Sequence, residues 1–156
     1  MPTPKQKLGR LGEELVATRC PCPRCKRERS LRRLPPNFKC ADVICDFCGY
    51  LAQVKTSNTN NATKLPALVA GAAWRVQKER MDSGIFFPLF LVLFESPRRY
   101  AIHYLSADLQ STAMFIMRKP LSPKARRAGW QGFMYNLRAV PNGGIVRVFA
   151  KGLGDQ

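Results

Sequence analysis

The stretch CADVICDFCGYLAQVKTS, residues 40–57, decides the fold because it carries two chemical patterns within eighteen residues. Its centre, CDFCG, has the Cys-x-x-Cys spacing of half a zinc site. The runs on either side, residues 41–44 and 51–56, are short and rich in β-forming side chains. This arrangement predicts a β-hairpin whose turn is held by a metal ion.

Four of the six cysteines form two Cys-x-x-Cys pairs, with nineteen residues between the pairs. They are Cys22, Cys25, Cys45 and Cys48. This spacing is typical of a four-thiolate zinc site, and zinc would organise the irregular segment 20–38, since its binding free energy is folding free energy. The alternative is a set of buried or free thiols. Cys20 and Cys40 lie outside the pairs, and either one remains an alternative ligand.

The same turn is flanked by residues whose types and sequence order match a nuclease metal site. They are Asp42 before the turn and Gln53 and Lys55 after it. Residues i and i+2 of a strand share a face, so Gln53 and Lys55 point together while Val54 points into the core. The oxygens of Asp42 and Gln53, with the Val54 carbonyl, would bind Mg²⁺, and Lys55 would position or deprotonate the attacking water. Glu13 is a candidate outer carboxylate on a predicted helix. From these residues alone, a solvated lysine beside a turn aspartate remains the simpler interpretation.

The charge balance predicts a nucleic-acid partner. Lys and Arg number 26 against 10 Asp and Glu, a net charge of +16, whereas solubility alone rarely needs more than about +8 in a small domain. The longest apolar run, residues 85–94, is too short to span a membrane and contains Pro88. We expect a cytoplasmic protein with no secretory signal and no membrane contact, in which paired cysteines bind metal.

The predicted elements favour an α/β or α+β class, with helices flanking one central mixed sheet. Helices are expected at residues 7–19 and 67–81, and strands at residues 85–94, 100–105, 133–137 and 145–149. The zinc element is inserted at about residues 20–48. We expect one domain over residues 1–156.

A basic block at residues 118–130 predicts contact with double-stranded DNA. Its residues are Arg118, Lys119, Lys124, Arg126, Arg127 and Trp130, and no acidic residue lies between Gln110 and Asn136. Arginine binds phosphate or guanine, and a loop tryptophan stacks on bases. The alternative is a solvated loop with Trp130 in the core. His103, the single histidine, is expected to be a strand residue without a functional role.

Four segments together resemble the DpnI-like family of restriction endonucleases. They are LGEELV…CPRC, ADVICDFCGYLAQVK, WRVQ and RKPLSPKARRAGW, and the similarity extends over about residues 8–148. The resemblance implies a PD-(D/E)xK nuclease core with an inserted zinc site, the two cysteine pairs as ligands, and the set Asp42, Gln53 and Lys55 with Glu13 on its helix. It also implies Mg²⁺-dependent hydrolysis of adenine-methylated GATC sites that leaves 5′-phosphate and 3′-hydroxyl ends, with Trp130 sensing the methyl group.

The chain departs from that family at two points. Gln53 stands where the family has Glu, and because a neutral amide is a weaker ligand we expect lower Mg²⁺ affinity or a preference for Mn²⁺. A related Mrr-like branch uses an Asp…Gln-x-Lys set, so we expect activity, as a monomer or a transient dimer on DNA. We also expect the family's C-terminal winged-helix domain to be absent. The alternatives are a structure-specific or RNA nuclease, or a non-catalytic zinc-stabilised nucleic-acid-binding protein with a decayed site.

Overall fold

The computed structural model describes residues 1–38 and 41–154 and divides the chain into two compact units. The first unit comprises Met1–Leu65, Phe87–Ala107 and Ile145–Gln156, and the second comprises Pro66–Phe86 and Asp108–Gly144. The two units differ in which residues contact one another, and this does not decide whether they are separate domains. One domain over residues 1–156 therefore stays a prediction.

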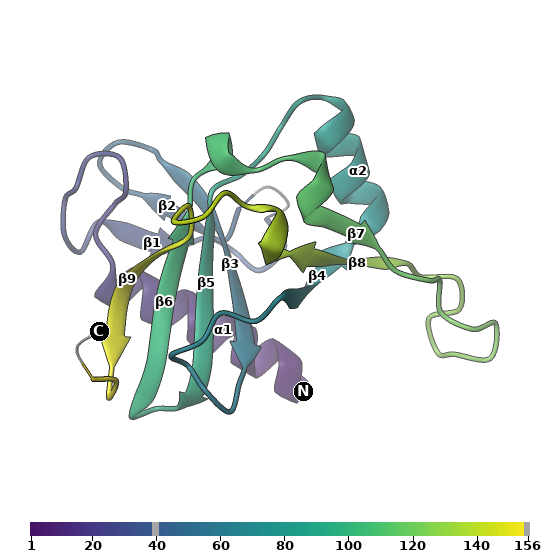
Figure 1. The fold of residues 1–156 in the computed structure, drawn as a ribbon, viewed down its shortest axis with the longest axis horizontal. Helices are drawn as coiled ribbons and strands as arrows, with labels where there is room; N and C mark the ends of the chain where they lie inside the picture. Colours follow the sequence, from purple (N-terminus) through teal and green to yellow (C-terminus); the bar gives the residue numbers. More distant parts are fainter. Residues whose placement is uncertain (39–40, 155–156) are drawn as a thin grey trace. The chain divides into compact units, whose positions relative to one another are not determined.

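The first unit is built on a six-stranded mixed sheet in the order β1-β2-β3-β5-β6-β9 (Figure 1). Its strands are β1 Leu31–Arg33, β2 Val43–Cys45, β3 Leu51–Asn58, β5 Leu89–Ser96, β6 Arg99–Leu105 and β9 Val146–Lys151. Strands β3 and β5 are parallel, and the other neighbouring pairs in this sheet are antiparallel. The predicted hairpin across the CDFCG turn is confirmed, because Val43 pairs with Ala52 and Ile44 with Leu51. The α+β class with a mixed central sheet is likewise confirmed.

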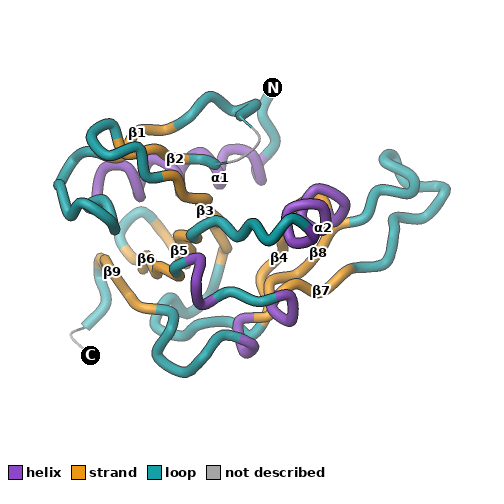
Figure 2. The backbone as a smooth tube through the Cα atoms, turned by 90° about the horizontal axis from the view of Figure 1, so that it is seen from above, coloured by secondary structure: helices purple, strands orange, loops and turns teal. Residues whose placement is uncertain are grey.

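Helix α1, Pro4–Arg19, covers part of this sheet, and Figure 2 shows it running alongside β1 to β3. It begins with a capping box, in which Thr3 and Gln6 exchange side-chain and backbone hydrogen bonds. Gly12 lies against β3, where a Cβ would overlap Thr56 Oγ1. The helix predicted at residues 7–19 is therefore confirmed and starts earlier. None of the described helices is long and apolar enough to cross a membrane.

The second unit contains an antiparallel sheet in the order β4-β8-β7 and one α-helix. Its elements are β4 Leu68–Ala73, α2 Trp74–Asp82, β7 Phe115–Met117 and β8 Gly132–Asn136. Short 3₁₀ turns occur at Ala107–Leu109, Thr112–Met114 and Leu137–Ala139. The expectation of one sheet was incomplete, since these strands form a second one.

The helix predicted over residues 67–81 was wrong in its first half, which forms β4. Val69 pairs with Tyr135 and Ala70 with Met134, while Gly71 lies directly against the Phe133 ring. Pairing with β8 therefore overrides the helical preference of this alanine-rich segment.

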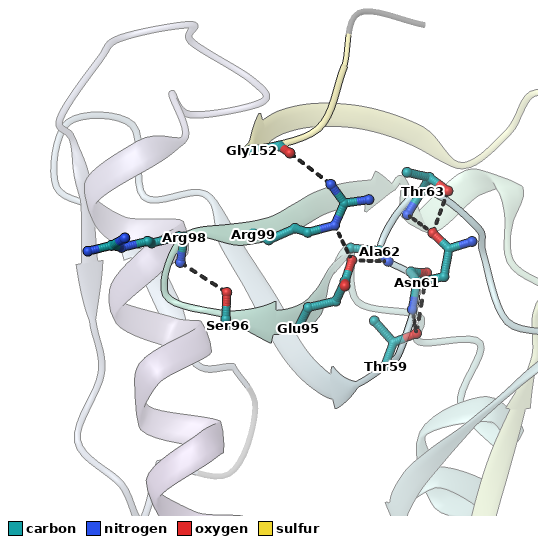
Figure 3. Close-up of polar contacts among 9 residues, drawn as sticks. All are labelled: Thr59, Asn61, Ala62, Thr63, Glu95, Ser96, Arg98, Arg99 and Gly152. Carbon is teal, nitrogen blue, oxygen red and sulfur yellow. Dashed lines mark hydrogen bonds and ion pairs between the residues drawn. The ribbon is translucent and has the colours of Figure 1, made fainter.

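The buried hairpin of β5 and β6 confirms the strand expected near residues 85–94 and its partner at residues 100–105, although β5 begins only at Leu89, directly after Pro88. Glu95 ties the turn end of this hairpin to its surroundings (Figure 3). One Glu95 oxygen, Oε2, accepts from Arg99 Nε and from the backbone N–H of Ala62, each at 2.8 Å. Arg99 Nη1 also donates to the Gly152 carbonyl at 2.9 Å. The two bonds to Glu95, first that from the Ala62 N–H and then that from Arg99, lower the pKa of its carboxyl. The bond from Ala62 also fixes the loop after β3 against the hairpin.

Candidate active site and metal centre

Four cysteines of the first unit are positioned to bind a metal such as zinc. Their Sγ atoms all lie within 4.8 Å of one another, with Cys22 and Cys48 at 3.5 Å and Cys25 and Cys45 at 3.7 Å. A zinc ion with Zn–S bonds of about 2.3 Å places its tetrahedral ligands about 3.8 Å apart. The donor chemistry and the spacing both fit a structural zinc site, as predicted from the sequence.

The two Cys-x-x-Cys pairs fold into matching turns. In each turn the residue after the second cysteine donates its N–H to the carbonyl of the first, Lys26 to Cys22 and Gly49 to Cys45, both at 2.9 Å. These two residues have left-handed backbone conformations, with φ of 65° for Lys26 and 78° for Gly49. Glycine adopts this region at no steric cost, whereas lysine does not. The first turn is therefore the more strained of the pair.

Strand β1 connects the cysteine cluster to the sheet, in a segment for which we expected no regular structure. Leu31 pairs with Cys45, and the Ser30 hydroxyl lies 3.3 Å from Cys45 Sγ. Cys20 is buried outside the cluster, and burial raises the pKa of its thiol to about 12, so it remains protonated. Cys40, the other cysteine set apart in the sequence, lies outside the described residues.

Asp42 is held against the edge of β3 just before β2 begins. Its backbone N–H donates to the Ala52 carbonyl at 3.0 Å, and its Oδ2 accepts from the N–H of Val54 at 2.8 Å. The N–H and C=O of one strand residue share an edge, so the Val54 carbonyl lies on the edge that Asp42 occupies. The hairpin thus brings Asp42 beside the backbone of the Gln53–Lys55 triplet.

The side chains of that triplet alternate as expected for a strand. Val54 packs against the hydrophobic core of the first unit. Gln53 and Lys55 are half-buried and lie on the opposite face of β3. The oxygens available here are the Asp42 carboxylate, the Gln53 amide and the Val54 carbonyl, and oxygens are the ligands that Mg²⁺ prefers. The Lys55 amine belongs to the same triplet.

Asp42 also influences the protonation of both Glu13 and Lys55. The pKa of Lys55 is lowered by burial and by the charge of Lys5, and Asp42 opposes this shift. The pKa of Glu13 is raised by burial and then by Asp42, against the opposing charges of Arg33 and Arg10. The structure therefore places Glu13, Asp42 and Lys55 in one electrostatic neighbourhood.

Three basic residues near this site were not singled out from the sequence. Lys5 acts on Lys55, and Arg33 Nη2 lies 3.9 Å from Glu13 Oε2. Lys5 and Arg10 lie on the same helix as Glu13, so helical spacing was the available signal. No sequence signal indicated Arg33, because it lies in the segment that we expected to be an irregular loop.

The predicted DNA-binding block lies in the second unit, between β7 and β8, and extends beyond the ends of these strands (Figure 1). Its five basic side chains, those of Arg118, Lys119, Lys124, Arg126 and Arg127, are all exposed. Trp130 is half-buried against Gly132, and the Arg127 guanidinium lies 4.4 Å from the centre of its ring. Trp130 is therefore neither free in solvent nor part of a closed core.

The sequence comparison agrees with this combination of features. The family described as DpnI, Dam-replacing family, matches residues 3–153, nearly the whole chain. The matched region includes the four clustered cysteines, the hairpin with Asp42 and Lys55, and the basic block. The chain therefore belongs to the DpnI, Dam-replacing family, and its general class is that of a restriction-like nuclease directed at DNA.

Proposed function

We propose that this protein is a metal-dependent endonuclease of double-stranded DNA, with Asp42, Gln53 and Lys55 as its catalytic residues. The observation that carries the proposal is the hydrogen bond from the Val54 N–H to Asp42 Oδ2. This bond holds the carboxylate beside the Gln53–Lys55 triplet, in the order expected of the family.

The hydrolysis follows from what each group offers. Asp42, Gln53 and the Val54 carbonyl would hold Mg²⁺, which supplies charge neutralisation at the scissile phosphate and acidifies water. Burial lowers the pKa of Lys55, so its amine is more readily available as a proton acceptor for the attacking water than that of a free lysine. Glu13 would accept hydrogen bonds from water beside Asp42. The water oxygen would bond to phosphorus as the bond to the 3′ oxygen breaks, and the water's proton would pass to Lys55. The departing 3′ oxygen would take up a proton from solvent water, which leaves a 3′-hydroxyl and a 5′-phosphate.

The substrate we propose is adenine-methylated DNA of the GATC type. Family membership supports it, as do the five exposed cations of the 118–130 block, which suit backbone phosphates. The half-buried Trp130 would pack against the adenine methyl group. Since Arg127 covers its ring, the guanidinium would shift toward phosphate when the ring takes up its contact.

A plasmid digest tests this proposal. The purified protein is incubated with methylated and unmethylated plasmid in Mg²⁺ or Mn²⁺, and cutting of the methylated plasmid is expected. Cutting of both plasmids would remove the methyl specificity and keep the nuclease. If neither plasmid is cut with any metal, the result would favour the alternative, a non-catalytic binding protein. The neutral side chain of Gln53 is the observation that supports this alternative.

The Gln53 amide gives a second, finer test. We expect Gln53→Glu to lower the Mg²⁺ concentration needed for half-maximal cutting, because a carboxylate binds Mg²⁺ more tightly than an amide oxygen does. Gln53→Leu, which removes the oxygen, is expected to raise that concentration. Metal titrations of the three proteins measure this, and identical Mg²⁺ dependence in all three would remove Gln53 from the site.

A further inference from the structure

A pocket of about 500 Å³ opens beside Glu13 in the first unit. One wall is a single face of α1, formed by Gln6, Gly9, Arg10 and Glu13 at the i, i+3, i+4 and i+7 positions. Arg33 and Leu34, at the end of β1, contribute to the facing wall. The pocket is thus bounded by the helix that carries the outer carboxylate and by the strand next to the hairpin of Asp42.

The charges around this pocket favour an anion. Two arginines, Arg10 and Arg33, line it together with Glu13. The contact of Arg33 with Glu13 is long, at 3.9 Å, so Arg33 keeps donors for another acceptor. Guanidinium groups match the oxygens of a phosphate with paired hydrogen bonds. Gly9 leaves the wall open, since a Cβ there would meet nothing within 4 Å.

We propose that this pocket binds a backbone phosphate of the DNA strand, next to the phosphate that is cut, through Arg10 and Arg33. The position rests on the proposed function. It follows from the pocket wall itself, because Leu34 donates its backbone N–H to the Asp42 carbonyl at 2.9 Å. A DNA strand carries one phosphate for about each 3.4 Å of rise, so a site adjoining Glu13 is within the reach of a neighbouring phosphate. The pocket would thereby set the register of the strand over the catalytic residues.

Three variants on α1 test the pocket. Arg10→Gln removes one of its charges, and Gly9→Leu fills it without a change of charge. Lys7→Gln is the matched control, because Lys7 is exposed on the same helix and does not line the pocket. Leucine and glutamine are good helix formers, so all three variants are expected to fold.

Duplex binding is measured in Ca²⁺ over a range of salt concentrations, and cutting is measured in Mg²⁺. We expect Arg10→Gln and Gly9→Leu each to weaken binding several-fold more than Lys7→Gln does, with the salt slope of Arg10→Gln reduced by about one. Placing a neutral methylphosphonate at one position beside the cut should weaken wild-type binding more than it weakens binding by Arg10→Gln, which keeps only Arg33. Inorganic phosphate alone should not compete at millimolar concentration.

The outcomes separate this inference from the proposed function. If the wild type cuts DNA but both pocket variants bind and cut as Lys7→Gln does, the pocket proposal is overturned and the nuclease stands. If no single methylphosphonate position is sensitive to Arg10→Gln, the pocket does not hold a backbone phosphate. If the wild type binds duplex without cutting, the nuclease fails, while the binding measurements still decide the pocket.

Discussion

Lys26 occupies the position in the first cysteine turn that Gly49 occupies in the second. Both residues have positive φ and donate equivalent hydrogen bonds. Because a left-handed conformation costs a non-glycine residue about 1 kcal/mol, we expect Lys26→Gly to raise the free energy of unfolding by up to that amount. Loss of the bond from Lys26 Nζ to the Pro23 carbonyl subtracts little, since it is exposed.

Chemical denaturation of the zinc-loaded protein measures this effect. Gly49→Ala is the matched variant and is expected to lose about 1 kcal/mol, because it introduces the same strain into the second turn. Equal destabilisation by Lys26→Gly and Gly49→Ala would show that the two turns are not equivalent.

We expect His103 to make the stability of the first unit depend on pH. Burial, with a contribution from Arg147 on β9, lowers the pKa of His103 to about 4, and its Nδ1 has no hydrogen-bond partner among the described residues. As the pH falls from about 6.5 to about 4, the unfolded chain takes up this proton first. The free energy of unfolding should therefore fall across that window, by at most about 1.4 kcal/mol per pH unit from this group, and be unaffected by it above the window.

The measurement is the free energy of unfolding between pH 4 and pH 8 for the wild type and for His103→Gln. The carboxyl groups titrate in both proteins, so the difference between the two curves isolates the histidine. A difference that does not change with pH would contradict the assignment.

Among the elements, the approach of α1 to β3 sets the position of Glu13. Gly12 allows this approach, because its Cβ would overlap Thr56. We expect Gly12→Ala to cost about 1–3 kcal/mol through overpacking and to reduce cutting, since it moves Glu13 away from Asp42. Gly9→Ala is the stability control on the same helix, and it should gain about 0.5–1 kcal/mol because nothing lies near its Cβ. Lys7→Gln, which lies outside the pocket beside Glu13, is the control for cutting.

Thermal or chemical unfolding and a cutting assay follow these variants. If Gly12→Ala is as stable as Gly9→Ala and cuts as well as Lys7→Gln, the close approach of helix and strand does not support the site.

The elements predicted correctly from the sequence are those whose own residues carry a clear hydrophobic periodicity or a turn signal. The helix with Leu8, Leu11 and Leu15, the hairpin around CDFCG and the β5–β6 hairpin follow from periodicity and turn residues. Strand β4 did not, because its state depends on pairing with β8, about sixty residues later in the chain. Strand β1 was missed for a related reason, since three residues carry too little periodicity to reveal the partner β2.

For the candidate site, the sequence predicted that Asp42 would lie beside the Gln53–Lys55 triplet in one hairpin, and the structure has this arrangement. Asp42, Gln53 and Lys55 are joined by a turn of known length, so strand alternation was enough to place them together. Arg33 and Lys5 were missed because they reach the site through the packing of β1 and α1, and such packing leaves no pattern in the sequence. The contact of the Arg127 guanidinium with the Trp130 ring was missed for a similar reason, because a contact between side chains of one loop leaves no pattern in the sequence.

At the scale of the whole molecule, the zinc element and the cutting site are expected to fail together. Cys45 ends the strand that Asp42 precedes, so removal of zinc should release the hairpin and displace the carboxylate. We expect a chelator to abolish cutting, and we expect recovery only when both Zn²⁺ and Mg²⁺ are returned.

Metal analysis and cutting assays check this expectation with two variants. Cys48→Ser should lose zinc and activity, whereas Cys20→Ser, which alters a buried cysteine outside the cluster, should keep about one zinc per chain. Recovery of the stripped wild type with Mg²⁺ alone would separate the zinc element from the active site.

The most direct test of the nuclease is the comparison of Lys55→Ala with the wild type on methylated duplex DNA. Binding in Ca²⁺ and cutting in Mg²⁺ are measured for both proteins, with Ser57→Ala, on the same face of β3, as the control. The expected result is unchanged binding and at least a 100-fold loss of cutting in Lys55→Ala, about the least that removal of a proton acceptor costs, with Ser57→Ala near the wild type. The assignment of Asp42, Gln53 and Lys55 as a nuclease site would be contradicted if Lys55→Ala cut DNA as fast as the wild type does. It would also be contradicted if the wild type itself did not cut.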